Sequence, residues 1–271
     1  MPDELQPRLD FARELIYAAG DVAMGYFERL ATLTVSNKGV QDVVSEADVE
    51  VERLIKARIA EVWPTDAFLG EETGHAASGS AGQSPGSTGI WVVDPIDGTQ
   101  PFLSGLGTWC VSIAYVRAGQ VQFGLVNAPA HRELFVGGRG VPATRNELPI
   151  HLHPGRALTD GMTYLGCSAR VTADDIVPVF DRLMRRRGMY VRNGSGALGI
   201  CDVACGRLLG MIEPHINSWD CLGGIAVLEA AGGVTNDYLV GDALLAGNWL
   251  VATTPPLYDA MHEVLRGTAV D

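Results

Sequence analysis

Two carboxylates three residues apart are the first sign of chemistry in the chain. Residues 91–99 read WVVDPIDGT, in which an apolar run ends at Asp94 and Asp97 follows one turn later. Pro95 cannot donate to a strand ladder, and the glycine and Thr99 after it favour a turn and a helix start. Carboxylates on such a stiff turn can converge on one point, and hard cations such as Mg2+ take oxygen ligands. In the alternative interpretation, which involves no cation, Asp97 only forms the turn and Thr99 is a helix N-cap.

Two further acidic motifs lie far from this segment in the sequence. Glu71 and Glu72 directly follow an apolar segment, and Asp220 precedes the apolar run CLGGIAVLEAAGG. Adjacent acids repel each other unless a cation or hydrogen bonds compensate, whereas a solvated acidic loop is the plain alternative. An aspartate before a helix is often only a cap. Together, the three acidic motifs predict a site assembled from both halves of the chain.

The overall charge restricts the partners of such a site. The 271 residues include 20 Lys+Arg and 32 Asp+Glu, which gives a net charge of −12. This acidity argues against a protein that binds the backbone of nucleic acids, because such proteins need basic patches. It does not exclude a phosphorylated small molecule, since a bound metal can supply positive charge. We therefore expect a small-molecule partner and no nucleic acid.

Location is predicted from the absence of targeting signals and from the cysteines. No stretch approaches the roughly 20 apolar residues that span a bilayer, and charged residues interrupt the N-terminal segment. The five cysteines form no CxxC pair, although Cys201 and Cys205 lie four residues apart. We therefore predict that the cysteines are reduced and mostly buried. We also predict that the protein is cytoplasmic and has no membrane partner.

The hydrophobic pattern predicts the elements that position the acidic motifs. Apolar residues at helical spacing indicate helices over residues 5–30, 47–62, 174–187, 197–205, 219–231 and 256–265. Strands are indicated over residues 67–70, 90–94, 109–116, 120–129, 133–138, 161–166, 189–192 and 209–213. The Gly, Ser and Ala-rich segment 74–89 predicts a flexible surface loop.

This order of elements predicts a layered α/β (α+β) sandwich, because a run of strands is followed by alternating helices and strands. We expect one compact unit of two halves. Residues 1–150 carry the GEE and DPIDGT motifs, and residues 151–271 carry Asp220.

The motifs in this order resemble those of the inositol monophosphatase family, a family of magnesium-dependent, lithium-sensitive phosphatases. The resemblance covers nearly the whole chain. Beyond GEE, DPIDGT and WD, it rests on KGVQDVVSEAD at 38–48, GCSAR at 166–170, NGSGA at 193–197, VACGR at 203–207 and EAAGG at 229–233. It implies the αβαβα fold shared by inositol monophosphatase and fructose-1,6-bisphosphatase, and a homodimer.

The resemblance also implies a set of metal ligands and a total of two to three Mg2+ per subunit. The first ion is expected at Glu71, Asp94 and the backbone carbonyl of Ile96, and the second at Asp94, Asp97 and Asp220. A third, weaker ion is expected near Glu71, with Glu72 and Asp48 as neighbours. Lys38 is either a cation of a loop at the site or a surface lysine. As catalytic residues the resemblance implies Asp94 together with Glu71 and Thr99, which orient and deprotonate a water.

For the substrate, the resemblance implies contacts with both the phosphate and the alcohol. The phosphate is expected at the metals and at the backbone of Gly98 and Thr99. The alcohol is expected at Glu213, unless this residue is only a capping or surface acid. The full predicted substrate set is Asp97, Gly98, Thr99, Gly194, Ser195, Gly196, Glu213 and Asp220. The reaction implied is hydrolysis of inositol 1-phosphate or a similar polyol phosphate to the alcohol and inorganic phosphate by attack of a metal-activated water.

Some residues depart from the family pattern. Gln100 and Pro101 follow DPIDGT, and a pair of glycines after Asp220 is expected to leave room behind that residue. Trp109 stands where relatives often carry a smaller residue or Phe, and histidinol-phosphate phosphatases sometimes carry Trp there. A histidinol-phosphate phosphatase, or a phosphatase of another small ester, is therefore the alternative. A non-catalytic binding protein is disfavoured, because every proposed ligand is present.

Overall fold

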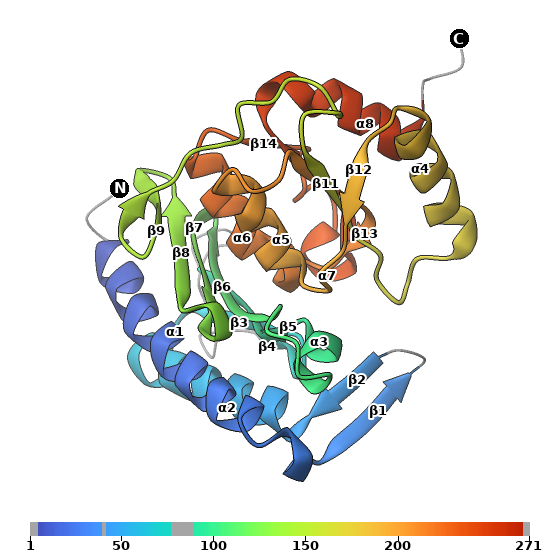
Figure 1. Cartoon of the computed structure of the whole chain (residues 1–271). Helices are drawn as coiled ribbons and strands as arrows, with labels where there is room; N and C mark the ends of the chain where they lie inside the picture. The colour runs from blue at the N-terminus through green and yellow to red at the C-terminus, as the bar shows by residue number, and fades with distance from the viewer. Residues whose placement is uncertain (1–4, 40–41, 77–88, 268–271) are drawn as a thin grey trace.

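Helical layers and β-sheets alternate through the molecule (Figure 1). The computed structural model describes residues 5–39, 42–76 and 89–267. Helices α1 (Gln6–Phe27) and α2 (Glu46–Val62) cover the outer face of an eight-stranded sheet, and α5 (Gly196–Ala204) and α6 (Ser218–Ala230) lie between it and a five-stranded sheet. Helices α4 (Ala173–Arg185) and α8 (Tyr258–Arg266) cover the far face of the second sheet. This αβαβα order confirms the predicted layered fold.

The eight-stranded sheet positions two of the acidic motifs. Its spatial order is β10-β9-β8-β7-β6-β5-β3-β4, and β3 and β5 pair in parallel whereas the other neighbours are antiparallel. Its strands are β3 (Ala67–Gly70), β4 (Gly74–Ala76), β5 (Ile90–Asp97), β6 (Cys110–Arg117), β7 (Gln120–Ala128), β8 (Glu133–Gly138), β9 (Val141–Arg145) and β10 (Leu148–Pro149). Because Gly70 lies opposite Val93, the residues that follow both strands emerge side by side.

The five-stranded sheet follows in the second half of the chain. Its strands, in spatial order, are β12 (Met189–Val191), β11 (Met162–Leu165), β13 (Gly210–Ile216), β15 (Asn248–Thr253) and β14 (Val234–Thr235). The remaining elements are the hairpin of β1 (Val35–Gly39) and β2 (Asp42–Ser45), the short helices α3 (Thr99–Leu103) and α7 (Ala243–Ala246), and 3-10 turns at Leu30–Thr32, Pro129–His131 and Pro255–Leu257. Strands β2, β9, β10, β14 and β15 were not predicted. Strand β4 lies within the predicted loop 74–89, of which residues 77–88 fall outside the described part of the chain.

Helix α6 packs closely against its neighbours, and this contradicts the expectation of free space behind Asp220. A Cβ on Gly223 would lie 2.5 Å from Oγ of Ser112, and one on Gly224 would lie 2.8 Å from Cβ of Ile200. These glycines therefore remove bulk so that α6 can approach the sheet and α5, because a well-packed interior does not accept extra atoms.

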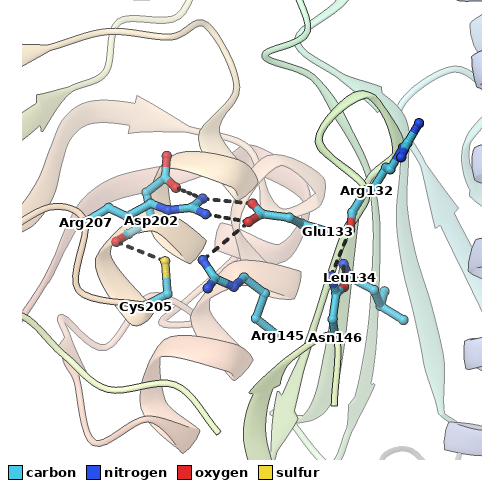
Figure 2. A network of polar contacts seen from close by, with 8 residues as sticks. All are labelled: Arg132, Glu133, Leu134, Arg145, Asn146, Asp202, Cys205 and Arg207. Atoms are coloured by element: carbon cyan, nitrogen blue, oxygen red, sulfur yellow. Dashed lines mark hydrogen bonds and ion pairs between the residues drawn. The ribbon is translucent and has the colours of Figure 1, made fainter. Parts of the chain in front are cut away.

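A polar network fastens the first sheet to the end of α5, as Figure 2 shows. Arg207 donates to both carboxylate oxygens of Glu133 in β8 and, at 2.9 Å, to Asp202 in α5. Arg145 of β9 lies 3.3 Å from the same Glu133. Because the network is partly exposed, each pair contributes roughly 0–1 kcal/mol, and its main effect is to fix how the layers align.

Within the described residues, no helix has the length and apolarity needed to cross a bilayer.

Candidate metal centre

Three carboxylates from separate parts of the chain meet at one point. Glu71 lies in the turn after β3, Asp94 in β5 and Asp220 in the first turn of α6. One oxygen of each lies within 4.8 Å of the other two. Asn217 fixes Asp220 by donating its backbone N–H at 3.2 Å and its side-chain N–H at 2.9 Å to Oδ2.

The electrostatics of this cluster favour a bound cation. Asp94 is only 1% exposed. Burial raises its pKa well above the usual range, and the negative charges of Glu71, Asp97 and Asp220 raise it further. Burial also raises the pKa of Asp220, which shares a hydrogen bond with Asp94. Buried carboxylates so close together either keep a proton or hold a cation, and oxygen donors of this kind fit Mg2+.

The raised pKa values predict how the stability of the metal-free protein depends on pH. Between about pH 4 and pH 7, folded Asp97 keeps a proton that the unfolded chain has released, so the free energy of unfolding falls as the pH rises. The raised pKa of Asp94 acts in the same direction. Addition of Mg2+ should reverse this loss, because it stabilises the ionised carboxylates. Urea denaturation at pH 5 and pH 8, with and without Mg2+, measures both effects. Equal metal-free stability at the two pH values would contradict the prediction.

Asp97 is directed mainly toward α5. Its Oδ2 accepts hydrogen bonds from Oγ of Ser195 and from N of Ala197, both at 2.6 Å, and its Oδ1 accepts from N of Gly196 at 3.1 Å. Burial and the charge of Asp220 raise its pKa from 3.8 to about 7, against the effect of these donors. The structure thus shows Asp97 at the N-terminus of α5, and binding of a second ion stays a prediction. Ser195 is fully buried and directs its hydroxyl at Asp97.

The hydroxyl of Thr99 contacts two groups, a carboxylate oxygen of Asp48 and the carbonyl oxygen of Ile96. It is 3.1 Å from Oδ1 of Asp48 and 3.2 Å from the carbonyl oxygen of Ile96. The other oxygen of Asp48 accepts hydrogen bonds from the backbone and hydroxyl of Ser45, and burial raises the pKa of Asp48. The resemblance implied that Asp48 lies near a third ion on the Glu71 side; the structure pairs Asp48 with Thr99, and the third ion stays a prediction. The side chain of Lys38 lies outside the described part of the structure.

One cavity of about 610 Å3 is lined by Glu71, Asp94, Asp97, Thr99 and Asp220. Glu213 is nearly buried in its wall, and its pKa is raised by burial and by Asp220 and Asp97, whereas Arg192 acts in the opposite direction. Among the described residues of the wall, Arg192 is the single basic one. Of the predicted substrate residues, the wall includes Asp97, Gly98, Thr99, Gly194, Gly196, Glu213 and Asp220, and it also includes Glu71, Asp94 and Ile96.

Trp109 lies away from this cavity. It is fully buried, and its ring packs against Phe102 at 4.9 Å and Phe27 at 5.4 Å between ring centroids. A core side chain cannot select a substrate by contact, so the position of Trp109 lends no support to histidinol phosphate, and that alternative stays a prediction. Gln100 and Pro101, by contrast, line the cavity.

Two residues of the site were missed by sequence reasoning. Glu52 of α2 is 1% exposed and accepts hydrogen bonds from the turn that carries Glu71. Its position among the buried residues Val51 and Ile55 was the available signal, since charged side chains are seldom fully buried without partners. Tyr164, whose hydroxyl accepts from N of Gly194 at 3.2 Å, carried no comparable signal.

Comparison with known proteins supports the same fold and shows the family. The model of the Inositol monophosphatase family matches residues 4–268, and the chain belongs to this family. It is 32% identical over 269 residues to the inositol-1-monophosphatase of Synechocystis sp., covering 98% of this chain and 91% of that protein. It is 28% identical over 266 residues to the Nus factor SuhB of Pseudomonas aeruginosa, covering 97% of both.

A solved structure shows the same architecture. The extragenic suppressor protein suhB from Bartonella henselae superimposes with a TM-score of 0.87 at 26% sequence identity. The match covers 97% of this chain and 100% of that one. The relatives thus include proteins named as phosphatases and proteins named as suppressor or Nus factors.

Proposed function

We propose that the protein is a Mg2+-dependent phosphomonoesterase that hydrolyses inositol 1-phosphate or a similar polyol phosphate. The observation that carries the proposal is the convergence of Glu71, Asp94 and Asp220 at a cavity that also contains Thr99 and Glu213. Glu71, Asp94, Asp220 and the carbonyl of Ile96 would hold Mg2+, with Asp97 beside them. When bound, Mg2+ supplies positive charge for the phosphate and the leaving oxygen and favours ionisation of water.

Thr99 and Asp48 form a route for the proton of the attacking water. The Thr99 hydroxyl donates toward Asp48, so its oxygen is left to accept a hydrogen bond from a water in the cavity. As the water oxygen forms its bond to phosphorus, its proton passes to Thr99, whose own proton passes to Asp48. Burial suits Asp48 to this task because it raises the pKa of a base toward the working pH.

We propose that the alcohol part of the substrate binds at Glu213. A nearly buried acid in a cavity wall needs polar partners, and hydroxyl groups of a polyol supply them. We predict that Glu213→Gln lowers kcat/KM for inositol 1-phosphate by about 10-fold or more, the effect of losing one buried hydrogen bond to the alcohol. The loss for p-nitrophenyl phosphate, which has no such hydroxyl groups, should be less than about threefold. Equal losses on both esters would rule out a contact between Glu213 and the alcohol.

The substrate class is tested by steady-state kinetics on four esters with Mg2+ present. They are inositol 1-phosphate, histidinol phosphate, fructose 1,6-bisphosphate and a 3′,5′-bisphosphate nucleotide. The proposal predicts the highest kcat/KM for inositol 1-phosphate. A higher value for histidinol phosphate would favour the alternative phosphatase.

A non-catalytic role is the second candidate, and the similarity to a protein named Nus factor SuhB is the observation that favours it. Absence of turnover on all four esters by a folded protein that binds Mg2+ would support that role. The intact set of acidic residues, with the Thr99–Asp48 pair, supports catalysis instead.

A further inference from the structure

We propose that Glu52 is a positioning residue, which holds Glu71 in the metal centre by fixing the backbone of the turn that carries it. The inference rests on the proposed function, because it concerns the Mg2+ affinity of the same site. Glu52 itself lies in α2, outside the group of converging carboxylates.

The backbone of this turn is bound at three consecutive residues. The N–H of Glu71 donates to the carbonyl of Val93 at 3.3 Å. The N–H of Glu72 donates to Oε2 of Glu52 at 2.8 Å, and the N–H of Thr73 donates to Oε1 at 2.9 Å. Since each N–H is held, the turn has little freedom to rotate, and the direction of the Glu71 side chain is set.

The contact requires a carboxylate rather than any polar group. Both oxygens of Glu52 act as acceptors, whereas an amide would present an N–H group to one of the two backbone donors. Gly70 gives the carboxylate its space, because a Cβ at that position would lie 2.3 Å from Oε2. Hydrogen bonds to an ionised acceptor are the strong ones, so the pair of contacts is a firm restraint.

One face of α2 positions two parts of the site at once. Asp48, Glu52 and Lys56 are spaced by four residues and therefore lie along the same side of the helix. Asp48 contacts the hydroxyl of Thr99, Glu52 holds the turn, and Nζ of Lys56 donates to Oγ1 of Thr73 at 2.9 Å. The rigid helix thus fixes the position of Glu71 relative to Thr99.

A purely structural role does not account for a buried charge here. Thr73 is exposed and Glu72 is half-buried, so the turn lies at the surface, where water is an alternative partner for backbone donors. Burying a carboxylate costs free energy, whereas water would satisfy the same donors at little cost. Precise placement of Glu71 in the metal centre explains why the Glu52 carboxylate is buried despite this cost.

The test compares Glu52→Gln with Glu50→Gln, which removes the same charge from an exposed position on the same helix. Mg2+ affinity is measured by calorimetry, and amide hydrogen exchange of Glu72 and Thr73 is measured in the metal-free protein. In Glu52→Gln we expect the Mg2+ Kd to rise by about 10-fold or more, and exchange at the two amides to accelerate by about 10-fold or more. In Glu50→Gln both quantities should stay within about twofold of wild type.

Separate outcomes overturn the positioning role and the proposed function. An unchanged Mg2+ Kd in Glu52→Gln, with or without faster exchange, overturns the positioning role alone. A wild-type protein that binds no Mg2+ overturns both. If Glu52→Gln does not fold, Lys56→Met takes its place, because it removes the other bond from α2 to this turn. We then expect a Kd about two- to fivefold higher and faster exchange at Thr73, and an unchanged Kd overturns the proposal.

Discussion

Replacement of Asp94 by Asn is expected to lower kcat/KM for inositol 1-phosphate on the order of 10³-fold, equivalent to about 4 kcal/mol of transition-state stabilisation. Asp94 is the carboxylate at the centre of the cluster, facing both Glu71 and Asp220. Asparagine keeps the shape of the side chain but removes the charge that Mg2+ needs. Initial rates across a range of Mg2+ concentrations measure the loss.

The same substitution should not destabilise the metal-free protein. The charges of Glu71, Asp97 and Asp220 raise the pKa of Asp94, which means that its ionised form is repelled in the fold. Removal of that charge at pH 8 is therefore expected to leave the free energy of unfolding equal or higher. Asp94→Asn protein that retains wild-type Mg2+-dependent activity would show that the site is wrongly assigned.

Asp97→Ala is expected to damage both stability and activity, in contrast with Asp94→Asn. The substitution leaves the N–H groups of Gly196 and Ala197 and the hydroxyl of Ser195 without their acceptor. Since each unpaired buried donor costs about 1–3 kcal/mol, we expect the free energy of unfolding to fall by about 3 kcal/mol or more. Urea denaturation measures this change.

Ser195→Ala is the matched control for Asp97→Ala. It removes one of the donors to Asp97 and leaves the two backbone contacts in place. Its expected cost is about 1 kcal/mol. If Asp97→Ala costs no more than Ser195→Ala, the N-terminus of α5 does not depend on Asp97.

The acidic motifs could be predicted because each one lies directly beside an apolar segment in the sequence. Glu71 follows β3, Asp94 lies in β5 directly after its apolar run, and β3 and β5 are parallel neighbours. Their carboxylates therefore emerge at the same edge of the sheet. Asp220 begins a helix that the apolar run after it predicts well.

The remaining features depend on contacts between distant parts of the chain. Thr99 meets Asp48 from 51 positions away, and Asp97 meets Ser195 from 98 positions away, so no local pattern encodes either pair. Strand β15 (Asn248–Thr253) is largely buried between two neighbours and lacks the alternation of polar and apolar residues that marks a half-exposed strand. The close packing of Gly223 and Gly224 likewise became visible only with Ser112 and Ile200 in place.

Release of inorganic phosphate from inositol 1-phosphate tests the central claim most directly. The measurement uses the full chain at about pH 8, because a higher pH favours the charged carboxylates that hold a cation. We predict release with Mg2+ present, its loss after chelation and its return when Mg2+ is restored. The same rate with and without Mg2+, or no release under any of these conditions, would contradict the assignment of Glu71, Asp94 and Asp220 as the centre of a Mg2+-dependent phosphatase.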